Sequence, residues 1–89
     1  MIRKTVLYSG RVQGVGFRAT TRMLAESFNV TGQVRNTIDG RVELIVEGER
    51  QEVRAFLDAL TDRMGRCIES ADTSESNATG SYDDFSIRY

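Results

Sequence analysis

The sequence predicts one α+β domain in which two helices cover a sheet. Three observations lead to this prediction. Two segments place apolar residues at helical spacing, several others alternate apolar and polar residues as half-buried strands do, and an Asp39-Gly40 pair separates two of the alternating segments. The element order β-α-β-β-α-β is the split βαβ arrangement of ferredoxin-like folds, which we expect as an antiparallel sheet with two helices on one face.

Length and composition narrow the classes of protein that this chain can represent. Its 89 residues, 39% of them apolar, leave room for a single domain over residues 1–89. The one cysteine, Cys67, cannot close an internal disulfide, and without histidine neither a zinc cluster nor a histidine-dependent catalytic pair can form. With no run of about 20 apolar residues and no export signal, we expect a soluble, cytoplasmic protein.

The first strand and the first helix flank a group of glycines. Residues 3–9 are short, β-branched and aromatic and end at Gly10, which predicts a strand. Apolar residues at helical spacing from Phe17 to Phe28 predict the helix. We expect it to stop near Asn29, because asparagine tolerates the left-handed conformation that often follows a helix.

A hairpin follows the first helix. Residues from Thr31 to Glu47 alternate between apolar or small and polar side chains, except at the Asp39-Gly40 pair. Tight hairpin turns demand positive φ, and both Asp and Gly accept it. We therefore expect two antiparallel strands joined by a turn at Asp39 and Gly40.

The second half of the chain contains the clearest element and the weakest. Apolar residues from Val53 to Met64 follow helical spacing, and Gly65 is a plausible end of that helix. Residues 66–71 predict only a weak strand. The stretch 70–84 is almost entirely polar, so we expect a mobile loop there. The alternating, aromatic residues 85–89 predict the last strand.

Charge is distributed unevenly along the chain. Residues 1–35 carry six basic residues against one acidic residue, Glu26, for a net charge of +5, whereas the whole chain has a net charge of −1. A sequence pI near 5.4 argues against a nucleic-acid binder, whose affinity rests on broad phosphate neutralisation. The N-terminal region can still attract a small anion.

The glycine-rich turn before the first helix is a candidate anion site. Gly10, Gly14 and Gly16 precede the helix, where free backbone N–H groups and the positive end of the dipole attract anions. Arg18 and Arg22 lie four residues apart near that end, where positive charge is disfavoured, so a negative group should compensate them. The competing interpretation is that both arginines point to solvent or pair with acids, and that the glycines only make a turn.

Asn36 is the second candidate for chemistry. In a split βαβ topology the first two strands run parallel, so their C-terminal ends lie on one edge of the sheet. Asn36, near the end of the second strand, should therefore meet the loop after the first strand, where its amide can donate and accept hydrogen bonds. The alternative is structural, because asparagine is common where a hairpin turn begins.

These residues resemble a known family. The segment Gly10–Arg18, with the sequence GRVQGVGFR, and the segment Gly32–Asn36 followed by residues 39–43 closely resemble the acylphosphatases, small enzymes of ferredoxin-like fold. The resemblance runs from about Val6 to Gly48 and resumes over residues 85–89. Two separated motifs and the end of the chain agree in order and spacing, so the resemblance is specific.

The resemblance implies hydrolysis of the carboxyl–phosphate bond of small-molecule acyl phosphates, with inorganic phosphate as a product and without a metal or cofactor. The family's phosphate-binding arginine falls on Arg18, and its water-positioning asparagine falls on Asn36. We expect a monomer with no nucleic-acid or membrane partner. The implied phosphate-binding residues are Gln13, Gly14, Val15, Gly16, Phe17 and Arg18.

A non-catalytic module that binds an anion or regulates another protein on the same fold is the alternative. A related domain stands at the N-terminus of a large hydrogenase-maturation protein that handles carbamoyl phosphate. A binder needs the anion site and Arg18, but it has no need of an amide that orients water. Asn36 therefore favours the hydrolase.

Overall fold

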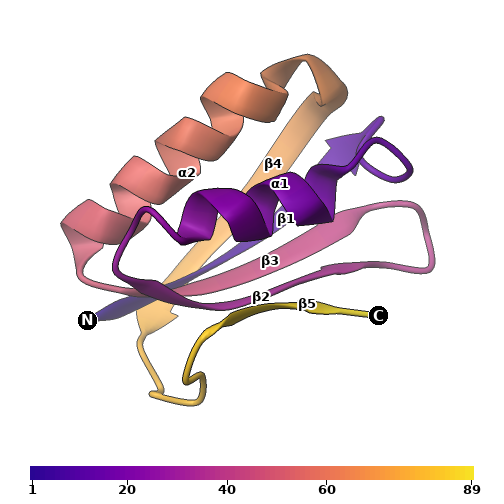
Figure 1. Cartoon of the computed structure of the whole chain (residues 1–89). Helices are drawn as coiled ribbons and strands as arrows, with labels where there is room; N and C mark the ends of the chain where they lie inside the picture. Colours follow the sequence, from indigo (N-terminus) through magenta and orange to yellow (C-terminus); the bar gives the residue numbers. More distant parts are fainter.

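In the computed structural model, which describes all 89 residues, a five-stranded sheet carries both helices on one face (Figure 1). The predicted α+β, ferredoxin-like fold is confirmed. The elements are, in chain order, β1 (Ile2–Gly10), α1 (Phe17–Ala25), β2 (Val30–Asn36), β3 (Val42–Gly48), α2 (Arg50–Met64), a 3₁₀ turn (Gly65–Cys67), β4 (Ile68–Asn77) and β5 (Phe85–Arg88). No helix is long and apolar enough to cross a membrane.

The sheet has the strand order β4-β1-β3-β2-β5. Both β1 and β2 pair antiparallel with β3, so they run parallel to each other and end at the same edge, as the sequence predicted. β5 pairs parallel with β2, from Gly32 opposite Phe85 to Arg35 opposite Arg88. The sheet is therefore mixed, because one parallel strand at this edge is added to the expected antiparallel sheet.

The strand β4 is the element that differs most from the sequence prediction. The stretch 70–84 was expected as a mobile loop, but the chain is a strand as far as Asn77 and pairs with β1 along its whole length. Every residue of β4 except Ile68 is exposed. Backbone hydrogen bonds to one neighbour stabilise an edge strand without apolar side chains, and charged residues there discourage further pairing. β4 completes the βαββαβ unit, and β5 is an additional strand.

The end of α1 also differs from the prediction. The helix ends at Ala25, and the backbone N–H groups of Glu26, Ser27 and Phe28 donate to carbonyls three residues back at 3.0–3.3 Å. These tighter bonds satisfy the last carbonyls of the helix, so no left-handed residue is needed. Asn29 accordingly has a negative φ, and the expectation of a left-handed stop there is wrong.

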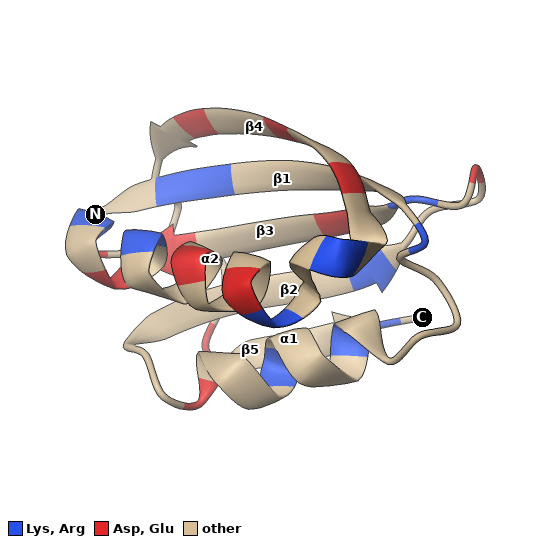
Figure 2. Cartoon of the chain, turned by 90° about the horizontal axis from the view of Figure 1, so that it is seen from above, with Lys and Arg blue, Asp and Glu red and all other residues tan.

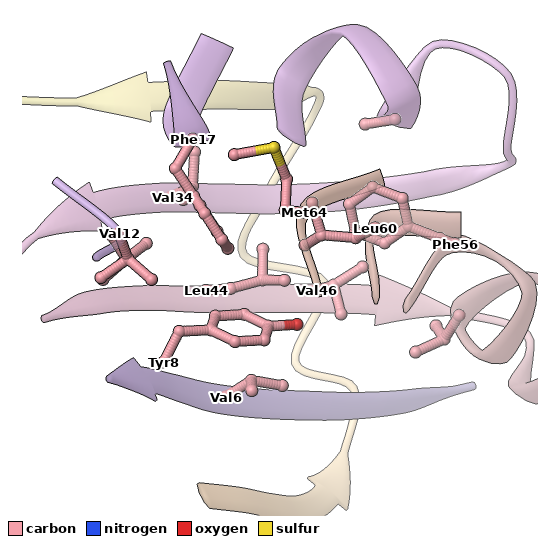
Figure 3. Packing of buried hydrophobic residues seen from close by; sticks show 13 residues of the cluster. Val6, Tyr8, Val12, Phe17, Val34, Leu44, Val46, Phe56, Leu60 and Met64 are labelled. Atoms are coloured by element: carbon pink, nitrogen blue, oxygen red, sulfur yellow. The ribbon is translucent and has the colours of Figure 1, made fainter. Parts of the chain in front are cut away.

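The core lies between the sheet and the two helices (Figure 3). The inward residues of β3 are Val42, Leu44 and Val46, each fully buried, which confirms the alternation expected for this strand. From α2, Phe56 packs its ring against those of Phe28 and Phe85, with centroids 6.0 and 5.5 Å away. Full burial of one such side chain stabilises the fold by about 1.5–3 kcal/mol. The other buried members are Val6, Tyr8, Val12, Phe17, Ala25, Val34, Val53, Leu60 and Met64.

A buried carboxylate organises the segment that joins β4 to β5. These strands lie at opposite edges, so the connection, residues 78–84, must cross four interstrand spacings, about 19 Å (Figure 1). Glu47, on the central strand β3 and only 3% exposed, accepts hydrogen bonds from the backbone N–H groups of Thr79 and Gly80, both at 3.0 Å. The Thr79 hydroxyl and Arg3 Nε also donate to it, at 2.9 and 2.7 Å. Glu47 thus attaches the crossing segment to the middle of the sheet.

Opposing effects set the pKa of Glu47. Burial by itself raises the pKa, because it penalises the charged form, but the hydrogen bonds from Thr79, Arg3 and Gly80 together outweigh burial and lower the pKa to about 2. The carboxylate therefore stays ionised in the folded protein.

Replacing Glu47 by Gln removes the charge that these donors surround. We expect the free energy of unfolding at neutral pH to fall by about 1–3 kcal/mol, since a buried hydrogen-bonding group loses partners. The matched control is Glu43→Gln, on the same strand and face, where the carboxylate pairs with the more exposed Arg35 at 2.9 Å. That change should cost about 0–1 kcal/mol. Urea unfolding measures both values.

The difference between wild type and Glu47→Gln should also depend on pH. The pKa of Glu47 is about 2 in the folded protein, below its ordinary value of 4.5. The stabilisation is therefore fully present above about pH 4.5 and is lost as the pH falls toward 2. Urea unfolding across this range should show the two proteins converging in stability, and a constant difference would contradict the role of the charge.

Candidate active site

A cleft lies at the edge of the sheet where β1 and β2 both end, beside the start of α1. Its volume is about 170 Å³. The residues that line it come from the loop after β1, from α1, from the end of β2 and from the end of the chain. They are Val12, Gly14, Gly16, Phe17, Arg18, Ala19, Asn36, Ile87 and Tyr89.

The glycine loop, residues 11–16, presents a free helix start to the cleft. Gly14 and Gly16 have φ values of 76° and 78°, in the left-handed region that glycine adopts without strain. Gly16 is the N-cap of α1, no side chain caps the helix, and no acidic residue lies in its first turn. The first N–H groups of α1 and the positive end of its dipole are therefore available to an anion.

Buried side chains hold both ends of the glycine loop. Val12 and Phe17 are each 1% exposed, and the backbone N–H of Arg11 donates to the carbonyl of Cys67 at 2.9 Å. The two predicted residues whose side chains do not line the cleft are Val15, which is exposed, and Gln13. Both were predicted as parts of the anion site, which their backbone N–H groups can still join.

Arg18, the second residue of α1, has no acidic partner. Its Nη1 donates to the carbonyl of Arg88 at 3.4 Å, and its guanidinium lies 4.8 Å from the centre of the Tyr89 ring. Arg22 lies 3.9 Å from Glu26, as an exposed pair one turn apart. Figure 2 shows the two basic positions along α1, the first of them beside the C-terminus. Pairing with an acid thus describes Arg22 but not Arg18, whose charge lies in the cleft.

Asn36, which lines the same cleft, contains a buried acceptor without a partner. It is the last residue of β2, opposite Val42 of β3, and its Oδ1 is buried without a hydrogen bond from any protein group. A buried acceptor without a donor costs about 1–3 kcal/mol, so a water molecule or substrate that donates to this oxygen gains that energy. Arg18 and Asn36, predicted from distant parts of the sequence, therefore meet in one place.

The turn after Asn36 differs in one detail from the prediction. Gly40 has a φ of 92°, as expected, but Asp39 has a negative φ. Asp39 instead accepts hydrogen bonds with its carboxylate, from Arg41 Nε at 2.9 Å and from the Thr37 hydroxyl. The hydrogen bonds from Arg41 and Thr37 lower the pKa of Asp39 to about 2. The acid closes the turn through its side chain, so its backbone needs no positive φ.

The family model that matches this chain is that of acylphosphatase, over residues 4–87. The chain belongs to the acylphosphatase family. It is therefore an acylphosphatase enzyme, which hydrolyses the carboxyl–phosphate bond of acyl phosphates to a carboxylate and inorganic phosphate. The fold, the reaction and the enzyme class predicted from the sequence are confirmed.

Similar proteins match this acylphosphatase at full length. An acylphosphatase of Syntrophus aciditrophicus is 46% identical over 90 residues, which cover 100% of this chain and 94% of that protein. An acylphosphatase of Paenarthrobacter aurescens is 41% identical over 87 residues, covering 97% and 93%. The crystal structure of acylphosphatase from Bacillus subtilis superposes on this structure with a TM-score of 0.90 at 32% identity, and the superposition covers 100% of both chains.

The sequence did not indicate the contribution of the end of the chain to the cleft of this acylphosphatase. Ile87 and Tyr89 line it, and Tyr89 lies against Arg18, which is 71 positions earlier in the chain. The alternation of the last strand was recognised, but its place beside β2 was not. The pairing of β5 with β2 places the end of the chain next to Asn36, and the alternation of apolar residues in the last strand does not reveal which strand it pairs with.

The left-handed φ of Gly16 allows a test of the loop. Gly16→Ala should lower the free energy of unfolding by about 1–2 kcal/mol, because a Cβ is strained in that conformation, although nothing lies within 4 Å of it. Gly65→Ala is the matched control, since Gly65 also has open space around it but a φ of −55°. That variant should gain about 0.4–1 kcal/mol. Urea unfolding measures both variants, and an equal change in the free energy of unfolding for the two would refute the strain argument.

Proposed function

We propose that this enzyme hydrolyses acyl phosphates by positioning and electrostatics, with the phosphoryl group held by the glycine loop and Arg18 and the attacking water held by Asn36. One observation carries the proposal. The same cleft, next to a free helix start, is lined by Arg18, which has no acidic partner, and by Asn36, whose buried amide oxygen has no donor. Arg18 and the helix start can each bind the phosphoryl group of an acyl phosphate, and Asn36 can bind the attacking water.

Arg18 supplies the charge for the phosphoryl group. Its planar guanidinium can donate two parallel hydrogen bonds to phosphoryl oxygens, and the backbone N–H groups of residues 13–18 can reach the others. These donors stand in place before the reaction begins, so they need little reorganisation as charge shifts during bond cleavage. The carbonyl of Arg88 and the ring of Tyr89 hold the guanidinium over the cleft.

Asn36 orients the water. Its Oδ1 accepts a hydrogen bond from the water, which directs an oxygen lone pair toward phosphorus, and its amide N–H can donate to the phosphoryl group. The water oxygen forms a bond to phosphorus while the bond from phosphorus to the acyl oxygen breaks, and the carboxylate leaves with the electron pair. A water proton passes to a phosphate oxygen. A carboxylate is a good leaving group, so alignment can replace a general base.

We propose that the reaction needs no metal ion or cofactor. The groups assigned to charge neutralisation are a guanidinium and backbone N–H groups, which do not bind cations. No three His, Cys, Asp or Glu side chains come together in the structure.

We further propose that the enzyme acts as a monomer in the cytoplasm on a small acyl phosphate, without a nucleic-acid or membrane partner. The thirteen residues of the hydrophobic core are buried by contacts within one chain, without a second copy. Cys67 is a free thiol, which suits a reducing compartment.

Arg18→Ala should lower kcat/KM by roughly 10²–10³-fold, the scale of losing one preorganised charge partner. The expected cause is loss of phosphate binding in ground and transition states, so inhibition by inorganic phosphate should weaken as well. Arg22→Ala is the matched control, because Arg22 is an exposed arginine one turn further along α1. Hydrolysis of an aromatic acyl phosphate measures both. Near-wild-type turnover in a folded Arg18→Ala variant would refute the assignment.

Two substitutions at Asn36 separate the orientation of water from general-base catalysis. Asn36→Ala should lose turnover and keep inhibition by inorganic phosphate, because Arg18 and the loop remain. Asn36→Asp should lose both, since a carboxylate lacks the N–H donor and repels the anionic substrate. A general base at this position would make Asp as good as Asn or better. Steady-state kinetics with phosphate as inhibitor measure these effects after circular dichroism has confirmed folding.

A further inference from the structure

The glycine loop and the β2–β3 turn meet through the side chain of Gln13. Gln13 Nε2 donates one hydrogen bond to the carbonyl of Thr37 at 2.9 Å and a second to that of Arg41 at 2.8 Å. Both protons of the amide are therefore used, and the side chain is half-buried between the two segments. Thr37 and Arg41 lie 24 and 28 positions after Gln13.

These two hydrogen bonds are the only ones that join the glycine loop to the turn. The pairing of β1 with β3 ends at Tyr8 opposite Val42, before the loop begins. The loop's one long-range bond between backbone groups, from the N–H of Arg11 to the carbonyl of Cys67, leads toward β4 and away from the turn. The spacing between the two segments thus depends on one side chain.

The two carbonyls that Gln13 contacts lie one residue beyond the pair formed by Asn36 and Val42. Asn36 pairs with Val42 in the hairpin, and Thr37 and Arg41 form the following pair, closed by a hydrogen bond from Thr37 N–H to the Arg41 carbonyl at 2.8 Å. Gln13 therefore holds the backbone on both strands one residue beyond the Asn36 position. A shift of the turn relative to the loop would move Asn36 relative to the phosphate site.

We propose that Gln13 is a positioning residue that sets the alignment of the Asn36-bound water with the phosphoryl group, a role that rests on the proposed function of Asn36. Attack on phosphorus needs the water in line with the leaving oxygen, and a misplacement of about 1 Å can cost on the order of 10²-fold in rate. The Gln13 side chain acts through the turn and touches neither the water nor the reacting atoms.

The turn has enough other bonds to survive without Gln13. The Arg41 carbonyl also accepts from the N–H of Thr37, and the Thr37 carbonyl accepts from that of Gly40 at 3.2 Å. Removal of the Gln13 amide therefore leaves neither carbonyl without a partner. The backbone N–H of residue 13 also stays in place, so the phosphate site keeps its donors.

The test is a double-mutant cycle between Gln13→Met and Asn36→Ala. Methionine has nearly the length of glutamine but no donor. In the wild-type background Gln13→Met should lower kcat by roughly tenfold and leave the inhibition constant of inorganic phosphate within about twofold. In the Asn36→Ala background the same change should lower kcat by less than about twofold, because residues that act as one unit are not additive.

The control is Gln51→Met, the same change at an exposed position of α2, which should leave kcat unchanged. Gln13→Asn, which keeps an amide too short to reach both carbonyls, should reproduce the Gln13→Met pattern and serves if that variant fails to fold. An equal kcat loss in both backgrounds, or a phosphate constant that rises with it, would show that Gln13 only shapes the loop and overturn the proposal. Full activity of Asn36→Ala alone would instead refute the role of Asn36, and the role of Gln13 with it.

Discussion

The candidate active site depends on the position of β3 between β1 and β2. Because both outer strands run antiparallel to β3, their C-terminal ends meet at one edge, and the residues that follow them become neighbours. The glycine loop after β1 and Asn36 at the end of β2 face each other for this reason. β5 extends the same edge by pairing with β2, which adds Ile87 and Tyr89 to the cleft. All the residues proposed for catalysis lie at this edge.

Electrostatics distinguish this edge from the rest of the surface. Several basic side chains of the sheet face acids across neighbouring strands, as Arg3 does with Glu47 and Lys4 with Glu75. Arg18, at the positive end of α1, contacts only the carbonyl of Arg88 and the ring of Tyr89 and no acidic group. Positive charge is disfavoured at a helix start, so an anion bound here would be stabilised by both the arginine and the helix dipole. In the proposed function, a phosphoryl group satisfies the arginine and the helix start, and the attacking water donates a hydrogen bond to the unpartnered Asn36 oxygen.

Sequence periodicity identified the elements that bury apolar side chains and failed where burial is absent. The alternation in β3 and the helical spacing in α2 reflect side chains that contact the core, so they leave a pattern. β4 contacts the core only through Ile68, and its pairing with β1 rests on backbone groups that every residue has. The polar composition of 70–77 was therefore interpreted as a loop. Asn29 and Asp39 show the same limit, because carbonyl and side-chain hydrogen bonds replaced the left-handed backbone expected from residue type.

The sequence alone determined the order of the first five elements and the glycine-rich loop and, through its resemblance to acylphosphatases, it predicted Arg18 and Asn36 as site residues. Each of these depends on neighbouring residues or on a contiguous motif. The tertiary structure decided that Asn36 Oδ1 lacks a partner, that Gln13 bonds to the turn beyond β2, and that Glu47 holds the segment before β5. These contacts join groups more than 20 positions apart, and their hydrogen bonds depend on distances of about 3 Å that only the packed sheet sets.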